Sequence, residues 1–293
     1  MRGPQTAARF SVAALLRESL HGTLVVLTLC AALLIAACAG NSPAKEESAS
    51  GNALTKAAQN IERRASQAFV KSEFDSAAAG YDSAALVYET LALPEPQARA
   101  RLSQARALAD AGRSRQALEI IMTLLQSPAG LSPEVMTTAH GRAAALTLDS
   151  DLPRAQMHLQ SAVLVCANTC VQTSALGALR ARAELAANNP TAAASSASAA
   201  LAAAQNSNDR ANALRARAQA NAALGQHAQV LLDAQQALAL DQELGLPPRV
   251  LADLVLLQRA SQALGDTAAS ARYSTLAQRA AAAGAALRGE VSK

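Results

Sequence analysis

The sequence is almost without aromatic residues, since it has no tryptophan, three tyrosines and three phenylalanines among 293 residues. Its charge is close to balanced, with 26 lysines and arginines against 22 aspartates and glutamates. A nucleic-acid-binding protein usually presents a strongly basic surface with aromatic side chains on which bases stack. The composition therefore argues against nucleic acid as a partner.

The chain also lacks the motifs of common catalytic and metal sites. Its four histidines are scattered and form no H-x-x-x-H or H-E-x-x-H pair. No phosphate-binding loop and no G-x-S-x-G sequence is present. One S-x-x-K match, Ser42–Lys45, lies in a segment without apolar periodicity and without the companion motifs of the enzymes that use it. The sequence predicts no cofactor, no metal site and no catalytic residue.

Cysteine is scarce, and two of the four cysteines, Cys166 and Cys170, lie close together in the body of the chain. Their spacing is not the C-x-x-C of redox-active pairs. A metal site would need two further ligands nearby, and this segment supplies none. Exported proteins meet oxidising conditions, so we predict a disulfide between Cys166 and Cys170 in an exported chain.

The hydrophobic fraction of 51% comes mostly from alanine. Alanine has the highest helix propensity, but it buries little surface per residue. A chain of this kind needs many helix pairs to be stable, which favours a long all-helical protein. No segment shows the sustained apolar and polar alternation of a β-strand, so we expect no strand.

The N-terminal residues have the layout of an export signal. Arg2, Arg9 and Arg17 form a basic leader, an apolar run extends from Gly22 to Ala37, and small residues surround Cys38. This arrangement resembles a secretory signal. The apolar run is shorter than the roughly 20 residues that a membrane-spanning helix needs.

The segment Leu33–Gly40, which reads LLIAACAG, resembles the lipobox of bacterial lipoprotein precursors. The resemblance implies that Cys38 carries a lipid and that residues 1–37 are removed. The leader holds three arginines and one glutamate, so removing it lowers the formal net charge from +4 to about +2. Ala39 resembles the sorting residue of Gram-negative outer-membrane lipoproteins and implies a periplasmic location at that membrane. The alternatives are an ordinary signal peptide or a membrane anchor, with Cys38 incidental.

Four segments follow from this layout: a signal peptide (1–37), a flexible tether (38–52), a helical body (53–287) and a short tail (288–293). The tether is rich in serine, alanine, glycine and charge. The body contains residues typical of helix starts, including Ser132-Pro133-Glu134 at one predicted helix start and Asn189-Pro190 at another.

A repeated pattern runs through the body. A small residue is followed seven positions later by a turn residue, and after the turn comes another small or apolar residue. The residues after the turn are Ala77, Ala117, Ala155, Ala193, Val230 and Ala269, with steps of 37 to 40 residues. The pattern predicts about six helix-turn-helix units whose turn residue tolerates a positive φ.

This pattern resembles the tetratricopeptide repeat (TPR) family over nearly all of the body. The resemblance implies an all-α, right-handed superhelical solenoid. The steps exceed the 34 residues usual in that family, and alanine replaces most of its aromatic and proline positions. The register of the fourth repeat is ambiguous by two residues. The alternative is an alanine-rich helical bundle.

In TPR proteins the first helix of each hairpin lines a concave groove. Carried over to this chain, the residue after the small packing position faces the groove, as does the residue three before it. These positions hold Arg106, His140, Arg182, Arg215 and Arg259. Because arginine pairs well with carboxylates, they predict a groove that binds an acidic segment of a protein partner. The alternative is that they are ordinary solvated arginines.

The two resemblances together imply an outer-membrane lipoprotein that acts as an interaction scaffold or assembly factor for an envelope complex. Known members of this layout serve pili, outer-membrane protein assembly or the cell-wall machinery. The alternative is a peptidoglycan enzyme on a solenoid scaffold, as in some lytic transglycosylases. That alternative needs a catalytic acid, and Glu62, Asp110 and Glu184 stand isolated. A carrier of lipid or pigment would need a roomier core than alanine provides.

Overall fold

The computed structural model describes residues 43–167 and 170–287, so Cys38, the predicted signal peptide and the predicted tail lie outside the described residues. The described residues form twelve helices and no strand. None of these helices combines the length and apolar character needed to cross a membrane. The helices are α2 (Pro43–Val70), α3 (Phe74–Thr90), α4 (Pro94–Asp110), α5 (Ser114–Gln126), α6 (Pro133–Thr147), α7 (Leu152–Cys166), α8 (Thr173–Ala186), α9 (Pro190–Ala202), α10 (Ser207–Ala223), α11 (His227–Glu243), α12 (Pro247–Ala263) and α13 (Thr267–Leu287).

Helix α2 begins at Pro43, so residues 43–52 of the predicted tether are helical in the structure. Proline suits the first position of a helix, because the N–H that it lacks would have no partner inside the helix there. The next residues, Ala44, Lys45, Glu46 and Glu47, are all good helix formers. Their helix propensity outweighs the polar, low-complexity character on which the tether prediction rested.

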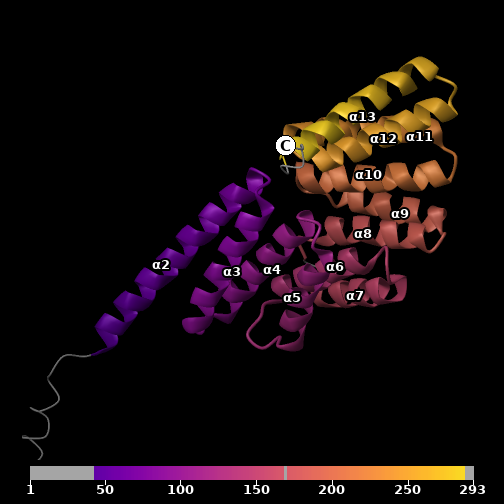
Figure 1. Cartoon of the computed structure of the whole chain (residues 1–293). Helices are drawn as coiled ribbons and strands as arrows, with labels where there is room; N and C mark the ends of the chain where they lie inside the picture. The colour runs from indigo at the N-terminus through magenta and orange to yellow at the C-terminus, as the bar shows by residue number, and fades with distance from the viewer. Residues whose placement is uncertain (1–42, 168–169, 288–293) are drawn as a thin grey trace, which may run out of the picture. The chain divides into compact units, whose positions relative to one another are not determined.

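The helices pair in chain order into six hairpins, as Figure 1 shows for the compact unit Leu54–Lys293. The predicted turn position adopts a positive φ in five of them, at Ser72, Gly112, Asn188, Gly225 and Gly265. The third hairpin differs. Its turn residue Ser150 has no positive φ, and the side chain of Asp151 instead caps α7 by accepting a hydrogen bond from the backbone N–H of Arg154.

The small residues of the repeat pattern form the contacts between helices. In the first five units the packing residue before the turn is buried, as is the residue after it: Ala65, Ala105, Ala143, Ala181, Ala218, Ala77, Ala117, Ala155, Ala193 and Val230. In the fourth unit Ala181 and Ala193 are fully buried and Asn188 occupies the turn. The structure therefore fixes the register that the sequence left ambiguous.

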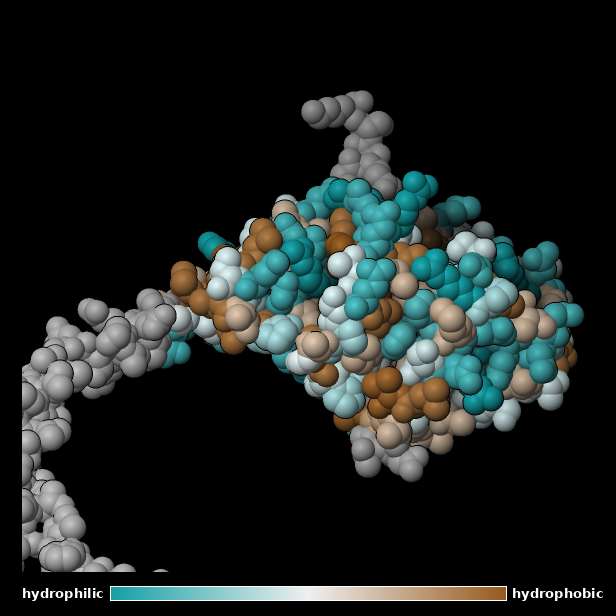
Figure 2. Space-filling view, turned by 90° about the horizontal axis from the view of Figure 1, so that it is seen from below, coloured by the Kyte–Doolittle hydropathy of each residue, from teal (hydrophilic) through white to brown (hydrophobic). Residues whose placement is uncertain are grey.

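Glycine and alanine let the paired helices approach closely. A Cβ built on Gly177 would lie 2.9 Å from the Cβ of Ala200, and one built on Gly80 would lie 2.8 Å from the Cβ of Ala65. Each alanine contact buries little area, so stability is spread over many helix interfaces. On the face of the molecule drawn in Figure 2, hydrophobic side chains gather in small patches among hydrophilic ones.

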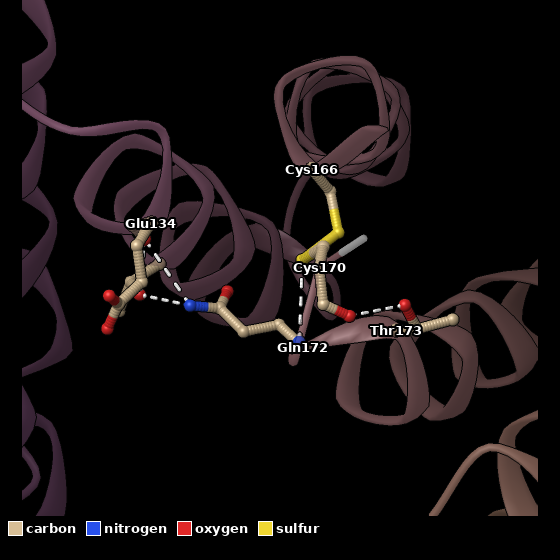
Figure 3. The surroundings of a disulfide bond; sticks show 6 residues. Glu134, Cys166, Cys170, Gln172 and Thr173 are labelled. Carbon is tan, nitrogen blue, oxygen red and sulfur yellow. Dashed lines mark hydrogen bonds between the residues drawn. A yellow bond between two sulfur atoms is a disulfide. The ribbon is translucent and has the colours of Figure 1, made fainter. Parts of the chain in front are cut away.

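A disulfide joins Cys166, at the end of α7, to Cys170. Gln172 follows it and crosses to α6, where its Nε2 donates to the hydroxyl of Thr138 (2.8 Å) and to the backbone carbonyl of Glu134 (3.3 Å). Figure 3 shows this arrangement, together with the hydroxyl of Thr173 donating to the carbonyl of Cys170 at 2.7 Å. The disulfide thus lies beside residues that connect α6 with the start of α8.

We expect the double substitution Cys166→Ser and Cys170→Ser to lower the free energy of unfolding by about 2 kcal/mol. This is what the chain-entropy account gives for so short a closed loop. Urea titration of the mature protein measures the effect. Intact mass after alkylation without reductant provides the control, because the oxidised wild type should take up no reagent at these two positions. Two alkylated thiols in freshly exported protein would contradict the predicted disulfide.

Candidate functional site

A cavity of about 680 Å³ opens between the first helices of three consecutive hairpins, α6, α8 and α10. These helices contact one another in order, α6 with α8 and α8 with α10. Arg249 of α12 also belongs to the lining. The first helices of the hairpins therefore share one hollow surface, which is the arrangement that the TPR resemblance implies.

Four arginines and no acidic residue line the cavity. The arginines are Arg142, Arg182, Arg215 and Arg249. Polar uncharged side chains add to them: Thr137, Thr138, Gln172, Asn212 and Gln219. Leu176 and Leu179 form an apolar part of the wall on α8. The cavity thus combines positive charge, hydrogen-bonding groups and a small apolar surface.

Two of the predicted arginines line this cavity, and they differ in exposure and in ion pairing. Arg182 is exposed and makes no ion pair or side-chain hydrogen bond within residues 43–167 and 170–287. Arg215 is only 12% exposed and is already paired, because its Nε donates to Oδ1 of Asp253 at 2.7 Å and its Nη2 contacts Asp241. Both aspartates are 0% exposed. Arg215 therefore lines the cavity, but it already has two carboxylate partners within the chain.

This buried charge cluster joins α10, α11 and α12. Burial raises the pKa of Asp253 to about 6, although Arg215 and Arg249 act in the opposite direction. The guanidinium of Arg249 lies 3.9 Å from Asp241 and donates to the side chain of Asn208 at 2.7 Å. Burial, followed by the charges of Arg215 and Arg106, lowers the pKa of Arg249. Two arginines and two aspartates thus neutralise one another beside the cavity.

Arg142 is a cation that reasoning from the sequence missed. Its Nη1 donates to the backbone carbonyl of Leu102 on α4. Burial, together with the charge of Arg106, lowers the pKa of Arg142 to about 10, so it remains protonated at neutral pH. Among the described residues, no carboxylate lies within ion-pair distance of it. Arg142 and Arg182 are therefore the two cavity arginines without a carboxylate partner.

Two predicted groove residues, Arg106 and Arg259, do not line the cavity. The guanidinium of Arg106 lies 4.5 Å from the centre of the Phe69 ring and 3.9 Å from Asp110. The charge of Arg106 lowers the pKa of Arg142 and of Arg249, and the charge of Asp110 acts on both in the opposite direction. Arg259 is exposed on α12, outside this lining.

His140, another predicted groove residue, does not line this cavity. Its Nδ1 lies 3.2 Å from Nδ1 of the buried His158 on α7, inside the third hairpin. On α6, Gly141 and Arg142 line the cavity instead, while Ala144 is buried. Burial lowers the pKa of both histidines.

The repeat pattern held no signal for the residues that the sequence reasoning missed. Gln172 stands nine positions before Ala181 and lines the cavity, but Glu134 and Asp209, nine positions before Ala143 and Ala218, do not. The pattern therefore gave no second groove position that would have found Arg249. The pattern held no signal for Arg142, because its counterparts Arg180 and Arg217 do not line this cavity.

The three acids considered for a catalytic role have separate neighbours. Glu62 accepts a hydrogen bond from the hydroxyl of Tyr88 at 2.8 Å. Asp110 lies 3.9 Å from Arg106, and Glu184 pairs with Arg180 at 2.9 Å. None of the three lines the arginine cavity.

No known protein family and no curated protein matches the sequence. Among solved structures, the chain is similar to BtubC (BKLC) from P. vanneervenii, with 17% identity and a TM-score of 0.53 over 76% of this chain and 91% of that chain. It also matches a Podosopora anserina protein with nearly identical TPR-like repeats of the kinesin-light-chain type. That match has 16% identity and a TM-score of 0.49, covering 65% of this chain and 97% of that chain.

The fold and the cavity define the class of protein. The chain is an all-helical repeat solenoid built from TPR-like hairpins. Repeat solenoids of this kind present an extended surface along their stacked helices.

Proposed function

We propose that this protein binds an acidic segment of a partner protein in the cavity between α6, α8 and α10. The observation that carries the proposal is the lining itself, which contains four arginines and no acidic residue. Asp241 and Asp253 neutralise Arg215 and Arg249, whereas Arg142 and Arg182 have no carboxylate partner among the described residues. A carboxylate from outside would complete this arrangement.

The rest of the lining indicates what accompanies the carboxylate. Leu176 and Leu179 offer an apolar surface to a neighbouring side chain of the partner. A peptide segment with carboxylates and an apolar side chain suits both features of the lining.

We further propose that the protein acts as a scaffold or assembly factor for an envelope complex, anchored by a lipid on Cys38 to the periplasmic face of the outer membrane. Three observations support this location. They are the lipobox resemblance of Leu33–Gly40, the sorting residue Ala39, and the disulfide between Cys166 and Cys170, which suits an oxidising compartment. Pilus, outer-membrane protein and cell-wall machineries all fit this role.

A photo-crosslinking residue placed at Gln219, on the wall of the cavity, tests the proposed function. Irradiation of cells that carry the full chain, followed by mass spectrometry, identifies the crosslinked segment. We expect one recurrent segment with several aspartates or glutamates. The matched control carries the crosslinker at Arg259, outside the cavity, and should not capture that segment. Capture of basic or random segments from Gln219 would contradict the proposal.

Replacing Cys38 by serine is expected to abolish lipid labelling and to leave an uncleaved or mislocalised precursor. Serine offers no thiol for attachment of the diacylglyceryl group, and stable membrane binding requires acyl chains because the segment after Cys38 is polar. Metabolic labelling with radioactive palmitate measures the effect. The control is Cys30→Ser, which leaves the lipobox intact. Label that persists in the Cys38→Ser protein would refute lipidation at this residue.

A further inference from the structure

The buried charge cluster on α10, α11 and α12 presents only its arginines to the arginine cavity. Arg215 and Arg249 belong to the lining. Asp241 and Asp253 do not, and both are 0% exposed. Arg215 joins the two sets, because its Nε and Nη2 donate to the two carboxylate oxygens of Asp253 at 2.7 and 3.3 Å. The charge state of Asp253 therefore acts directly on an arginine of the cavity wall.

One proton decides the net charge of this cluster. With both carboxylates ionised, the charges of the two arginines and the two aspartates cancel. If Asp253 is protonated, the cluster carries one net positive charge, and the arginines that carry it line the cavity. A neutral carboxyl group also holds a guanidinium less strongly than a carboxylate does. An incoming carboxylate then competes better for Arg215.

Asp253 is placed to take up this proton. Burial raises its pKa to about 6, and the charges of Arg215 and Arg249 act in the opposite direction. Asp241 of α11 shares Arg215 with it. Among the described residues, neither arginine of α13 is one of the charges that act on it. A carboxylate that enters the cavity adds negative charge nearby, which raises the pKa of Asp253 further.

Two further sites gain positive charge in acid. On α4, burial raises the pKa of Asp110, which lies 3.9 Å from Arg106. Within the third hairpin, the Nδ1 atoms of His140 and His158 lie 3.2 Å apart, and burial lowers the pKa of both histidines. A test of Asp253 must therefore separate its effect from theirs.

We propose that the arginine cavity binds its acidic segment together with one proton, which Asp253 takes up as the segment binds. This inference rests on the proposed function, because it concerns the regulation of the same site. Binding and protonation are linked, so the factor by which the segment favours protonated Asp253 is also the factor by which protonation favours the segment. Affinity therefore rises as the pH falls towards 5.5, where aspartates and glutamates of ordinary pKa on the segment remain mostly ionised.

A synthetic peptide whose charge does not change with pH serves as the probe. Cysteic acid residues alternate in it with leucine and alanine, and their sulfonate groups stay ionised throughout the pH range used. Fluorescence anisotropy of the rhodamine-labelled peptide with the full mature chain gives the dissociation constant. We expect binding to be about fivefold tighter at pH 5.5 than at pH 7.5, the lower end of the usual coupling between two linked equilibria. Calorimetry at pH 6.5 in two buffers of different ionisation enthalpy should show proton uptake on binding.

Matched variants assign the proton to its site. Asp253→Asn fixes the neutral form, so it should bind as tightly at pH 7.5 as at pH 5.5 and take up no proton. Asp233→Asn should keep the wild-type pH dependence, because Asp233 is equally buried but pairs with Arg217, and neither residue lines the cavity. Equal affinity of the wild type at both pH values would overturn the proposal. A pH dependence that persists in Asp253→Asn would also overturn it and assign the proton to Asp110 or the histidines. Absence of binding at either pH would instead contradict the proposed function.

Discussion

Replacing Arg215 by alanine is expected to lower the free energy of unfolding by about 3–5 kcal/mol, the usual cost of leaving a buried charge without its partner. Asp241 and Asp253 are 0% exposed, and both pair with Arg215. Arg249 lies 3.9 Å from Asp241, too far to replace the lost contact directly. The substitution therefore leaves two buried carboxylates, with Arg249 as the nearby cation at 3.9 Å from Asp241.

The stability lost in Arg215→Ala should be smaller at low pH than at high pH. Burial already raises the pKa of Asp253 to about 6 in the wild type, above its ordinary value of 3.8. A raised carboxyl pKa in the folded state means that the folded protein binds more protons, so stability falls as pH rises from about 4 through the folded pKa. Without Arg215 this pKa rises further. The variant should therefore be closer to the wild type at pH 5 than at pH 8.

Urea titration at pH 5 and pH 8 measures both effects, with Arg259→Ala as the matched control. Arg259 is exposed and forms no ion pair among the described residues, so its loss should change the free energy of unfolding by less than about 0.5 kcal/mol. If Arg215→Ala is as mild as Arg259→Ala, then the charge cluster does not hold α10, α11 and α12 together.

The double substitution Arg142→Ala and Arg182→Ala is expected to weaken binding of the crosslinked acidic segment by tenfold or more. Hydrogen bonds to charged groups contribute roughly 1.5–3 kcal/mol each, and every 1.4 kcal/mol corresponds to a factor of ten in affinity. Arg215 is left in place, so the buried cluster is intact. Binding by the wild type should also weaken as salt rises, because ions screen the attraction.

Titration at two salt concentrations tests this second prediction, and Arg259→Ala again provides the control. Thermal melting of the double variant shows whether the fold is retained, since Arg142 also donates to the carbonyl of Leu102. An affinity unchanged in a folded double variant would mean that the cavity arginines are ordinary solvated side chains.

The fold could be predicted from the sequence because the repeat pattern reflects what each hairpin needs at its turn and at its helix contacts. A positive φ demands a tolerant residue at the turn, and Gly112, Asn188 and Gly225 adopt it. Close helix packing demands small residues, and Ala105, Ala181 and Ala218 are buried as expected. These demands arise within one hairpin, so a single repeat reveals them.

The site was harder to predict because it depends on contacts between repeats. Arg215 and Arg182 look alike in sequence, each followed or preceded by alanine in a first helix. Only the stacking of α10, α11 and α12 brings Asp241 and Asp253 to Arg215, which makes it a structural residue. On α6, Arg142 lines the cavity, whereas His140 contacts His158 within its own hairpin.

The most direct measurement follows the arginine side chains themselves. Nuclear magnetic resonance of the Nε–H groups reports each guanidinium during titration with the acidic segment captured from Gln219. We predict that the Arg142 and Arg182 signals shift with saturation and that the Arg259 signal does not move. Unmoved signals for Arg142 and Arg182 at saturating segment would contradict the claim that this cavity is the binding site.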